Sequence, residues 1–255
     1  MADPVAATRW HEGGVVSEPE FGDSNRVLDG LMRYVVIGPI VHGMTRMKIS
    51  GREHIPAEGQ PAIIASNHLS FVDSMVIPLA SGRRVSFLGK AEYFTGTGVK
   101  GAFLRSWMRS FGTIPVERED ARAAAESLHI AERVLASGGA FGIYPEGTRS
   151  RDGRLHRGRT GVARLALTTG APIIPCALSG TQDVQPPDAR LPRPAKVTVS
   201  FGPPIDVAGL AAQFTKAKLL REITDAVTDA IGEMSGQERS GRYASDVNAE
   251  LEGHS

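Results

Sequence analysis

The sequence has very little cysteine. Its 255 residues include one, Cys176. A single thiol excludes an internal disulfide, and it also excludes a metal site built from several thiolates. Such sparing use of cysteine fits a reducing compartment, so we expect the protein to lie in the cytosol.

The sequence also lacks a long apolar run. Its longest apolar stretch, between Arg33 and Arg46, is interrupted by Gly38, Pro39 and His42. A membrane-spanning helix needs about 20 predominantly apolar residues, so we expect none. The first 25 residues carry more acidic than basic side chains, the opposite of the basic and then apolar layout of a secretory signal. We therefore expect neither a membrane span nor export.

Aromatic residues and net charge are both low. Aromatics make up 6% of the chain and do not alternate with its basic residues, which argues against nucleic-acid binding. The formal charge of +1 conceals an asymmetry, because residues 81–164 contain 15 Lys and Arg against 8 Asp and Glu, whereas residues 206–255 contain 5 against 9. A basic middle between acidic ends predicts that the central part meets an anionic ligand or surface.

Short apolar runs alternate with helical patterns through most of the chain. This alternation predicts an α/β fold: a layered helix-sheet-helix domain around a mainly parallel mixed sheet. We expect strands at residues 45–49, 62–66, 85–88, 112–116, 141–144, 173–177 and 196–201. Helices are expected at residues 72–80, 102–110, 121–136, 162–169 and 216–234.

The polarity pattern divides the chain into four parts. We expect a disordered tail at residues 1–25, an amphipathic helical segment at 26–44, a folded domain at 45–235 and a second disordered tail at 236–255. Within the second part, the apolar spacing predicts an amphipathic helix over residues 26–37, which Pro39 then stops. That helix either covers the core or lies in a membrane interface.

The first motif, residues 67–73, reads N-H-L-S-F-V-D and follows an apolar strand. Ligands of α/β proteins bind where strands give way to helices. A carboxylate from Asp73 can hold His68 at Nδ1 and make its Nε2 a better base toward an alcohol. The alternative is a purely structural role, in which Asp73 caps backbone N–H groups at a helix start and His68 is a surface residue without a function. Asn67 and Ser70 complete a pattern that is rare by chance.

A second informative segment, residues 144–150, reads Y-P-E-G-T-R-S and again follows a strand. Gly147 allows a ligand to approach the backbone, Thr148 offers a hydroxyl, and Arg149 offers a planar guanidinium suited to phosphate. Further arginines follow up to Arg164 and could equally form a solvated basic face. Arg149 is therefore the preferred phosphate ligand.

Through these two segments and two further motifs, the chain resembles the glycerophospholipid acyltransferase superfamily. Within it, the chain is similar to the bacterial 1-acylglycerol-3-phosphate (lysophosphatidic acid) acyltransferases. Four ordered motifs carry the resemblance. They lie at residues 67–73, 112–118, 144–150 and 171–176 and together cover roughly residues 49–181.

The resemblance implies a function and roles for single residues. His68 is implied as general base and Asp73 as its orienting carboxylate, while Arg118 and the segment Glu146, Gly147, Thr148 and Arg149 are implied to bind the substrate phosphate. Supporting roles fall to Asn67, Ser70 and Pro175, the last either in donor binding or simply at a strand edge. Residues 45–235 would be the acyltransferase domain and residues 26–44 its membrane-associating helix.

The implied reaction moves a fatty acyl group from an acyl thioester to the sn-2 hydroxyl of lysophosphatidate and yields phosphatidate. The donor would be acyl-CoA or acyl carrier protein, and no metal or cofactor is expected. Glycerol 3-phosphate or another lysophospholipid stays open as the acceptor. We expect a peripheral protein on the cytoplasmic face of the plasma membrane, with the membrane surface and no nucleic acid as its partner.

The chain departs from the family pattern at residues 90–101. The expected Lys-x-Glu-Leu-Phe stretch reads K-A-E-Y-F here, and it is followed by T-G-T-G-V-K-G. This difference affects the expected shape of the acyl channel or acceptor rim.

Three other functions compete with the acyltransferase interpretation. Residues 96–101 match the glycine spacing of a dinucleotide site, but they do not directly follow the strand end as that site requires. A serine hydrolase would need a Gly-x-Ser-x-Gly elbow, which the sequence lacks. A non-catalytic, peripheral lipid-binding protein remains as the alternative from a different class.

Overall fold

The protein is built on a seven-stranded, mostly parallel sheet. The computed structural model describes residues 35, 38–90, 112–116, 121–186, 192–253. The strands are β1 (Lys48–Ser50), β2 (Ala62–Ser66), β3 (Val85–Lys90), β4 (Thr113–Val116), β5 (Ala140–Ile143), β6 (Ile173–Ser179) and β7 (Thr198–Phe201). Their order is β1-β7-β6-β2-β5-β3-β4, and only the pair β6 and β7 is antiparallel. The predicted α/β class with a mainly parallel mixed sheet is confirmed.

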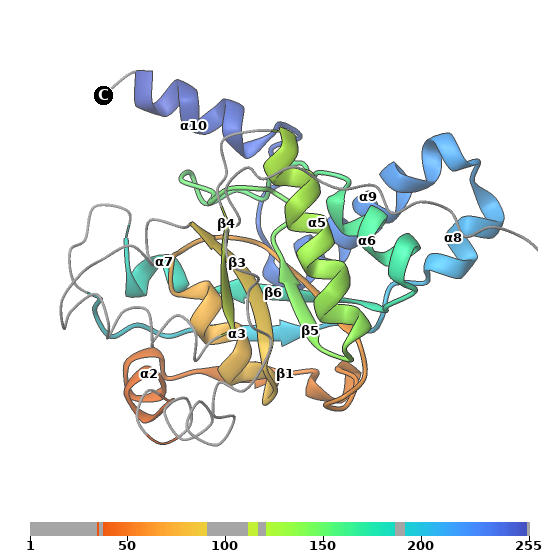
Figure 1. Ribbon diagram of the computed structural model, residues 1–255. Helices are drawn as coiled ribbons and strands as arrows, with labels where there is room; N and C mark the ends of the chain where they lie inside the picture. The colour runs from red at the N-terminus through yellow and green to blue at the C-terminus, as the bar shows by residue number, and fades with distance from the viewer. Residues whose placement is uncertain (1–34, 36–37, 91–111, 117–120, 187–191, 254–255) are drawn as a thin grey trace, which may run out of the picture.

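Helices cover the sheet and connect its strands (Figure 1). They are α2 (Gly38–Thr45), α3 (Asp73–Ser81), α5 (Ala121–Ala136), α6 (Gly161–Thr169), α7 (Thr181–Val184), α8 (Val207–Gln213), α9 (Lys216–Ser235) and α10 (Ala244–Gly253), with a short 3₁₀ turn at Arg52–His54. The helices predicted at residues 72–80, 121–136, 162–169 and 216–234 correspond to α3, α5, α6 and α9. The helix predicted at residues 102–110 lies outside the described residues.

The apolar sequence of β2 explains how the layers pack. All five residues of the strand are buried, and successive side chains of a strand point to opposite faces. Ile63 accordingly packs in the cluster formed with α5, α6 and α9, whereas Ile64 packs with residues of α3. A strand buried on both faces needs the continuous apolar run seen here.

Cys176 lies in this buried interior. Its thiol is fully buried in β6. Burial is the largest cause of a rise in the pKa of Cys176 to about 12. The lone cysteine is thus an inert packing residue, as a small buried thiol is expected to be.

The part of the chain before the sheet differs from its prediction. Residues 1–25, and all of the predicted 26–37 helix except residue 35, lie outside the described residues. Pro39 does not stop a helix but lies in the first turn of α2, a position that tolerates its missing N–H. Among the described residues, no helix is both long and apolar enough to cross a membrane.

The predicted disorder from Gly236 onward is wrong for the residues the structure describes. Residues 244–253 form α10, and Ala244 and Val247 on it are buried. Before α10, Glu238 and Ser240 pair through their backbones with the distant Leu155, a contact that local composition does not reveal.

Candidate active site

The first and third motifs meet at one edge of the sheet. β2 leads into His68 and β5 leads into Tyr144, and the two strands are parallel neighbours. Their carboxyl ends therefore lie side by side, where α/β proteins bind ligands. The backbone N–H of Ser150 donates to the carbonyl oxygen of His68 at 2.8 Å. The two motifs thus form one structure.

His68 and Asp73 form the pair that the sequence predicts. Nδ1 of His68 lies 2.8 Å from Oδ2 of Asp73. Because a carboxylate only accepts hydrogen bonds, Nδ1 carries the proton and Nε2 presents a lone pair. The His68 side chain is 16% exposed while that of Asp73 is fully buried. Among the described residues, Nε2 of His68 has no hydrogen-bond partner.

Asp73 also binds backbone N–H groups, although these belong to the loop before α3 and not to the start of the helix. Its Oδ2 accepts the backbone N–H groups of Leu69, at 2.7 Å, and of Ser70, at 2.8 Å, as well as the imidazole. The carboxylate therefore shapes the loop and orients His68 at the same time. Its other oxygen, Oδ1, is buried without a hydrogen-bond partner among the described residues.

Tyr144 is a site residue to which sequence reasoning assigned no role. Its ring stacks on the imidazole of His68, with centroids 3.8 Å apart and planes 8° apart. Its hydroxyl lies 2.9 Å from Oγ of Ser74, and its ring also stacks against Phe87. Tyr144 therefore fixes the plane of the imidazole. The signal was an aromatic residue at the strand end directly before the motif's Pro145.

Glu146 has a different place from the one predicted. Its side chain is buried, and its two oxygens accept the backbone N–H groups of His68 and His156, each at 2.9 Å. Burial raises the pKa of Glu146 to about 7, against the lowering effect of the two N–H groups. Both oxygens face protein donors, so the predicted phosphate contact does not fit this residue. Glu146 instead connects the loop that contains His68 to the loop that contains His156.

The next three residues form the exposed part of the loop. Gly147 has a φ of +78°, a left-handed conformation that favours glycine. Thr148 is half-buried, and Arg149 is exposed. The guanidinium of Arg149 has no hydrogen bond or ion pair among the described residues, whereas its carbonyl oxygen accepts from Nδ2 of Asn248. A fixed backbone with a free guanidinium suits an anionic ligand.

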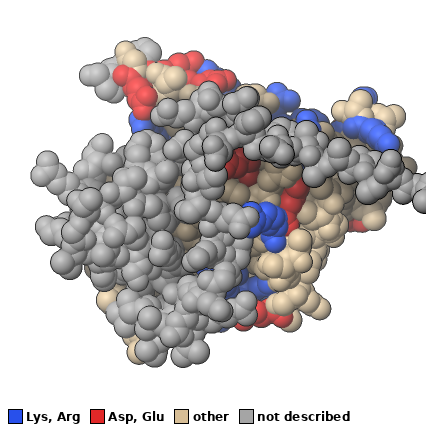
Figure 2. Space-filling model, in the orientation of Figure 1, with Lys and Arg blue, Asp and Glu red and all other residues tan. Residues whose placement is uncertain are grey.

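Most of the later arginines are engaged elsewhere. Arg151 pairs with Glu252 of α10, and Arg154 pairs with Asp152. The guanidiniums of Arg157 and Arg159 lie over the ring of Tyr243, at 5.4 and 5.2 Å. Figure 2 shows acidic side chains gathered over α10, next to basic ones. The expected basic middle is therefore partly neutralised by the acidic end of the chain.

The supporting residues Asn67 and Ser70 join the site to β6 and to the segment after α7. Oδ1 of Asn67 accepts from the backbone N–H of Leu178 at 2.8 Å, and Nδ2 donates to the carbonyl of Leu178 at 2.9 Å. Ser70 donates to the carbonyl of Gln185. Both side chains are buried, so they build the loop rather than face a ligand.

Pro175 lies in the interior of the sheet. It is buried in β6, where it pairs in register with Ala65 of β2. β6 stands between β2 and β7, so the interpretation of Pro175 as a strand-edge residue is wrong.

The second motif is described only in part. β4 runs parallel to β3, and β3 runs parallel to β5, so the carboxyl end of β4 points to the same edge of the sheet as the site. Arg118 follows that end but lies outside the described residues, as does most of the divergent stretch at 90–101.

Known proteins are similar to this chain in sequence and fold. The family model described as Acyltransferase matches residues 46–179. A 1-acyl-sn-glycerol-3-phosphate acyltransferase from Borreliella burgdorferi is 28% identical over 179 residues, covering 70% of this chain and 69% of that protein. The chloroplastic 1-acyl-sn-glycerol-3-phosphate acyltransferase LPAT1 from Arabidopsis thaliana is 32% identical over 147 residues, covering 57% of this chain and 39% of that protein.

The chain thus spans less than half the length of this relative, and its match to the chloroplastic 1-acyl-sn-glycerol-3-phosphate acyltransferase BAT2 from Brassica napus, 31% identical over 146 residues, likewise covers 41% of that protein. The crystal structure of the 1-acyl-sn-glycerophosphate acyltransferase PlsC from Thermotoga maritima aligns with a TM-score of 0.61 at 22% identity, covering 82% of this chain and 80% of that one. That likeness shows a common fold. With more than half of its residues matched by the family model, the chain belongs to the Acyltransferase family.

Proposed function

We propose that the protein transfers a fatty acyl group from an acyl thioester to the sn-2 hydroxyl of 1-acylglycerol 3-phosphate and produces phosphatidate. The observation that carries the proposal is the His68–Asp73 pair, whose Nε2 has no hydrogen-bond partner among the described residues, together with the exposed Arg149 on the loop that pairs with His68 through Ser150. The names of the relatives support the choice of acceptor. Acyl-CoA and acyl carrier protein are both suitable donors.

In this mechanism His68 acts as general base. Its Nε2 takes the proton of the acceptor hydroxyl while the hydroxyl oxygen attacks the thioester carbonyl carbon. The resulting tetrahedral intermediate collapses, the carbon–sulfur bond breaks, and the thiolate recovers the proton from the imidazolium. Asp73 stabilises that imidazolium through the 2.8 Å contact at Nδ1, and Tyr144 holds the ring in plane.

The phosphate of the acceptor would be bound by the exposed loop. Arg149 offers two parallel N–H donors to a phosphate, and Gly147 and Thr148 add a close backbone and a hydroxyl. Glu146 holds this loop against the His68 loop through its two accepted hydrogen bonds. By family resemblance, Arg118 adds a second guanidinium.

We also propose that the protein binds peripherally to the cytoplasmic face of the plasma membrane. Val35 is 62% exposed and Ile40 is 54% exposed, and both belong to the segment predicted to associate with a membrane. Large apolar side chains exposed on one segment favour insertion into the headgroup region.

An acceptor panel tests the proposed function. The purified protein is incubated with one radiolabelled acyl-CoA and, separately, with 1-acylglycerol 3-phosphate, glycerol 3-phosphate and a lysophosphatidylcholine. We expect labelled phosphatidate as the main product. Preferential labelling of either other acceptor would reassign the substrate, and no labelled lipid from any acceptor, with acyl-CoA or acyl carrier protein as donor, would refute the acyltransferase proposal.

A further inference from the structure

The end of the chain pairs with the loop that follows the third motif. The carbonyl of Glu238 accepts from the N–H of Leu155 at 2.9 Å, and the N–H of Ser240 donates to the carbonyl of Leu155 at 3.0 Å. The carbonyl of Arg242 accepts from the N–H of Arg157 at 2.8 Å. Residues 237–242, which we name the C-terminal strap, therefore lie alongside residues 155–157 in parallel orientation.

Gln237 connects the strap to the first motif. Its Oε1 accepts from Nδ2 of Asn67 at 2.6 Å, and its Nε2 donates to the carbonyl of Gly153 at 2.7 Å. Asn67 is fully buried and directly precedes His68. One side chain of the strap thus bridges the loops of the first and third motifs.

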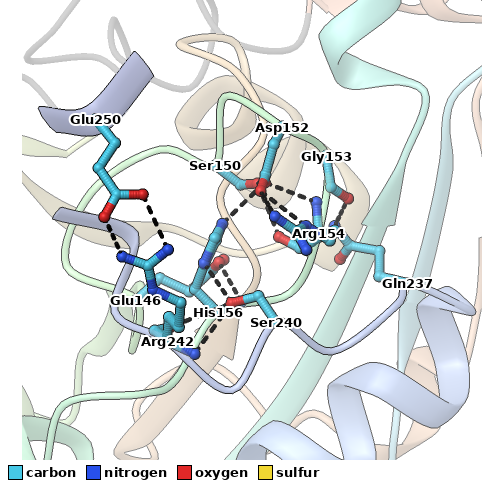
Figure 3. Close-up of polar contacts among 10 residues, drawn as sticks. All are labelled: Glu146, Ser150, Asp152, Gly153, Arg154, His156, Gln237, Ser240, Arg242 and Glu250. Atoms are coloured by element: carbon cyan, nitrogen blue, oxygen red, sulfur yellow. Dashed lines mark hydrogen bonds and ion pairs between the residues drawn. The ribbon is translucent and has the colours of Figure 1, made fainter. Parts of the chain in front are cut away.

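Ser240 connects the strap to Glu146 through a buried histidine (Figure 3). His156 is fully buried, with Nδ1 at 2.7 Å from Oγ of Ser240 and Nε2 at 2.9 Å from Oδ1 of Asp152. Both ring nitrogens are therefore held. The backbone N–H of His156 donates to Oε2 of Glu146, whose Oε1 accepts from the N–H of His68.

We propose that Gln237 and Ser240 are positioning residues that fix the His68 loop from the end of the chain. Gln237 acts through Asn67. Ser240 acts through His156 and Glu146, because the two side-chain oxygens of Glu146 accept hydrogen bonds from both loops. The expected effect on catalysis rests on the proposed function, whereas the effect on the loop does not.

Local hydrogen exchange tests the effect on the loop without any assay of activity. The amides of His68 and His156 both donate to Glu146, so their exchange reports whether this clamp stays closed. Loss of one hydrogen bond from Gln237→Ala or Ser240→Ala should speed their exchange about 2- to 10-fold. The amide of Ile63, in the fully buried β2, should exchange as in the unmodified protein.

Glu238→Gln is the matched control. Glu238 lies between the two positioning residues, its side chain is exposed, and only its carbonyl contacts Leu155. This variant should leave all these amides unchanged. Unchanged exchange at His68 in Gln237→Ala and Ser240→Ala, or an equal acceleration at Ile63, would overturn the proposal. The second result would mean that the strap stabilises only the whole fold.

A coupled variant tests the path through His156. His156→Gln preserves a group that can reach Asp152 but removes the partner of Ser240. In that background, Ser240→Ala should cause no further acceleration at His68, since residues that act through one contact are not additive. A full additional effect would contradict the path.

Steady-state kinetics test the catalytic consequence. Ser240→Ala and Gln237→Ala should lower kcat about 2- to 10-fold, because they disturb the loop that carries the base. Faster exchange at His68 in a protein that transfers no acyl group would refute the proposed function alone. Efficient transfer with unchanged exchange and kcat in both variants would refute the positioning role alone.

Discussion

Replacing Asp73 by Asn separates the charge of this residue from its shape. Oδ2 of Asp73 accepts three hydrogen bonds, from Nδ1 of His68 and from the N–H groups of Leu69 and Ser70. An asparagine can keep an oxygen at that place, and its amide nitrogen can occupy the place of Oδ1, which has no partner among the described residues. Asp73→Asn therefore preserves the loop but removes the negative charge that stabilises the imidazolium.

The size of the effect follows from the difference between the two kinds of hydrogen bond. A hydrogen bond to a charged group is worth about 1.5 to 3 kcal/mol, against about 0.5 to 1.5 kcal/mol for a neutral one. The transition state should lose the difference between these two ranges, about 1 to 1.5 kcal/mol, which lowers kcat about 5- to 10-fold. The free energy of unfolding should stay close to that of the unmodified protein, because a fully buried carboxylate is replaced by a neutral group of the same shape.

The assay combines initial rates of phosphatidate formation with urea unfolding. Asp73→Ala serves as contrast, because it leaves two backbone N–H groups without their acceptor and should lower the free energy of unfolding by about 1 to 3 kcal/mol for each. Asp183→Asn is the control, since Asp183 is exposed on α7. Unaltered kcat in Asp73→Asn would refute the orienting role, and equal losses of stability in both Asp73 variants would reduce that role to holding the loop.

Three further predictions concern the loop charges and the membrane. The pKa of Glu146 is raised to about 7 in the folded protein from an ordinary 4.5, so folding favours its neutral form and the free energy of unfolding should fall by up to about 3 kcal/mol as the pH rises from 4.5 to 7. Glu146→Gln should remove this pH dependence in urea unfolding, and an unchanged dependence would assign it to another group. Arg149→Ala should raise the KM of the phosphate acceptor about 10- to 100-fold, whereas Arg151→Ala, which removes a partner of Glu252, should not; equal effects would indicate general electrostatics. Ile40→Glu should reduce sedimentation with anionic vesicles at least tenfold, whereas Leu167→Glu, at a side chain 43% exposed on α6, should leave it unchanged; the reverse order would place the membrane contact elsewhere.

The sequence predicts the sheet and its main helices because their signals are local. The run at residues 62–66 is apolar throughout, and it forms the doubly buried β2. The predicted helix at 121–136 has the bounds of α5, since its apolar spacing ends at a pair of glycines. The His68–Asp73 contact is equally local, because five residues separate the partners and a helix start brings them together.

Features that depend on distant partners were not predictable in the same way. Glu146 belongs to a segment whose residue types suggest ligand binding. Its oxygens nevertheless accept from the N–H groups of His68 and His156, which come near only in the folded sheet. The polar segment after Gly236 contains little that predicts order. Its structure comes from Leu155 and from two side-chain contacts, at Asn67 and His156, that lie far away in the sequence.

The central claim is that His68 is the base in acyl transfer to a glycerol-phosphate lipid. The most direct measurement compares the protein with His68→Ala, using labelled acyl-CoA and 1-acylglycerol 3-phosphate, with the free energy of unfolding measured for both. We expect phosphatidate formation by the unmodified protein and a kcat lowered by about 10² to 10⁴ in the variant, with the fold intact. A folded His68→Ala protein that forms phosphatidate at the unmodified rate would contradict it.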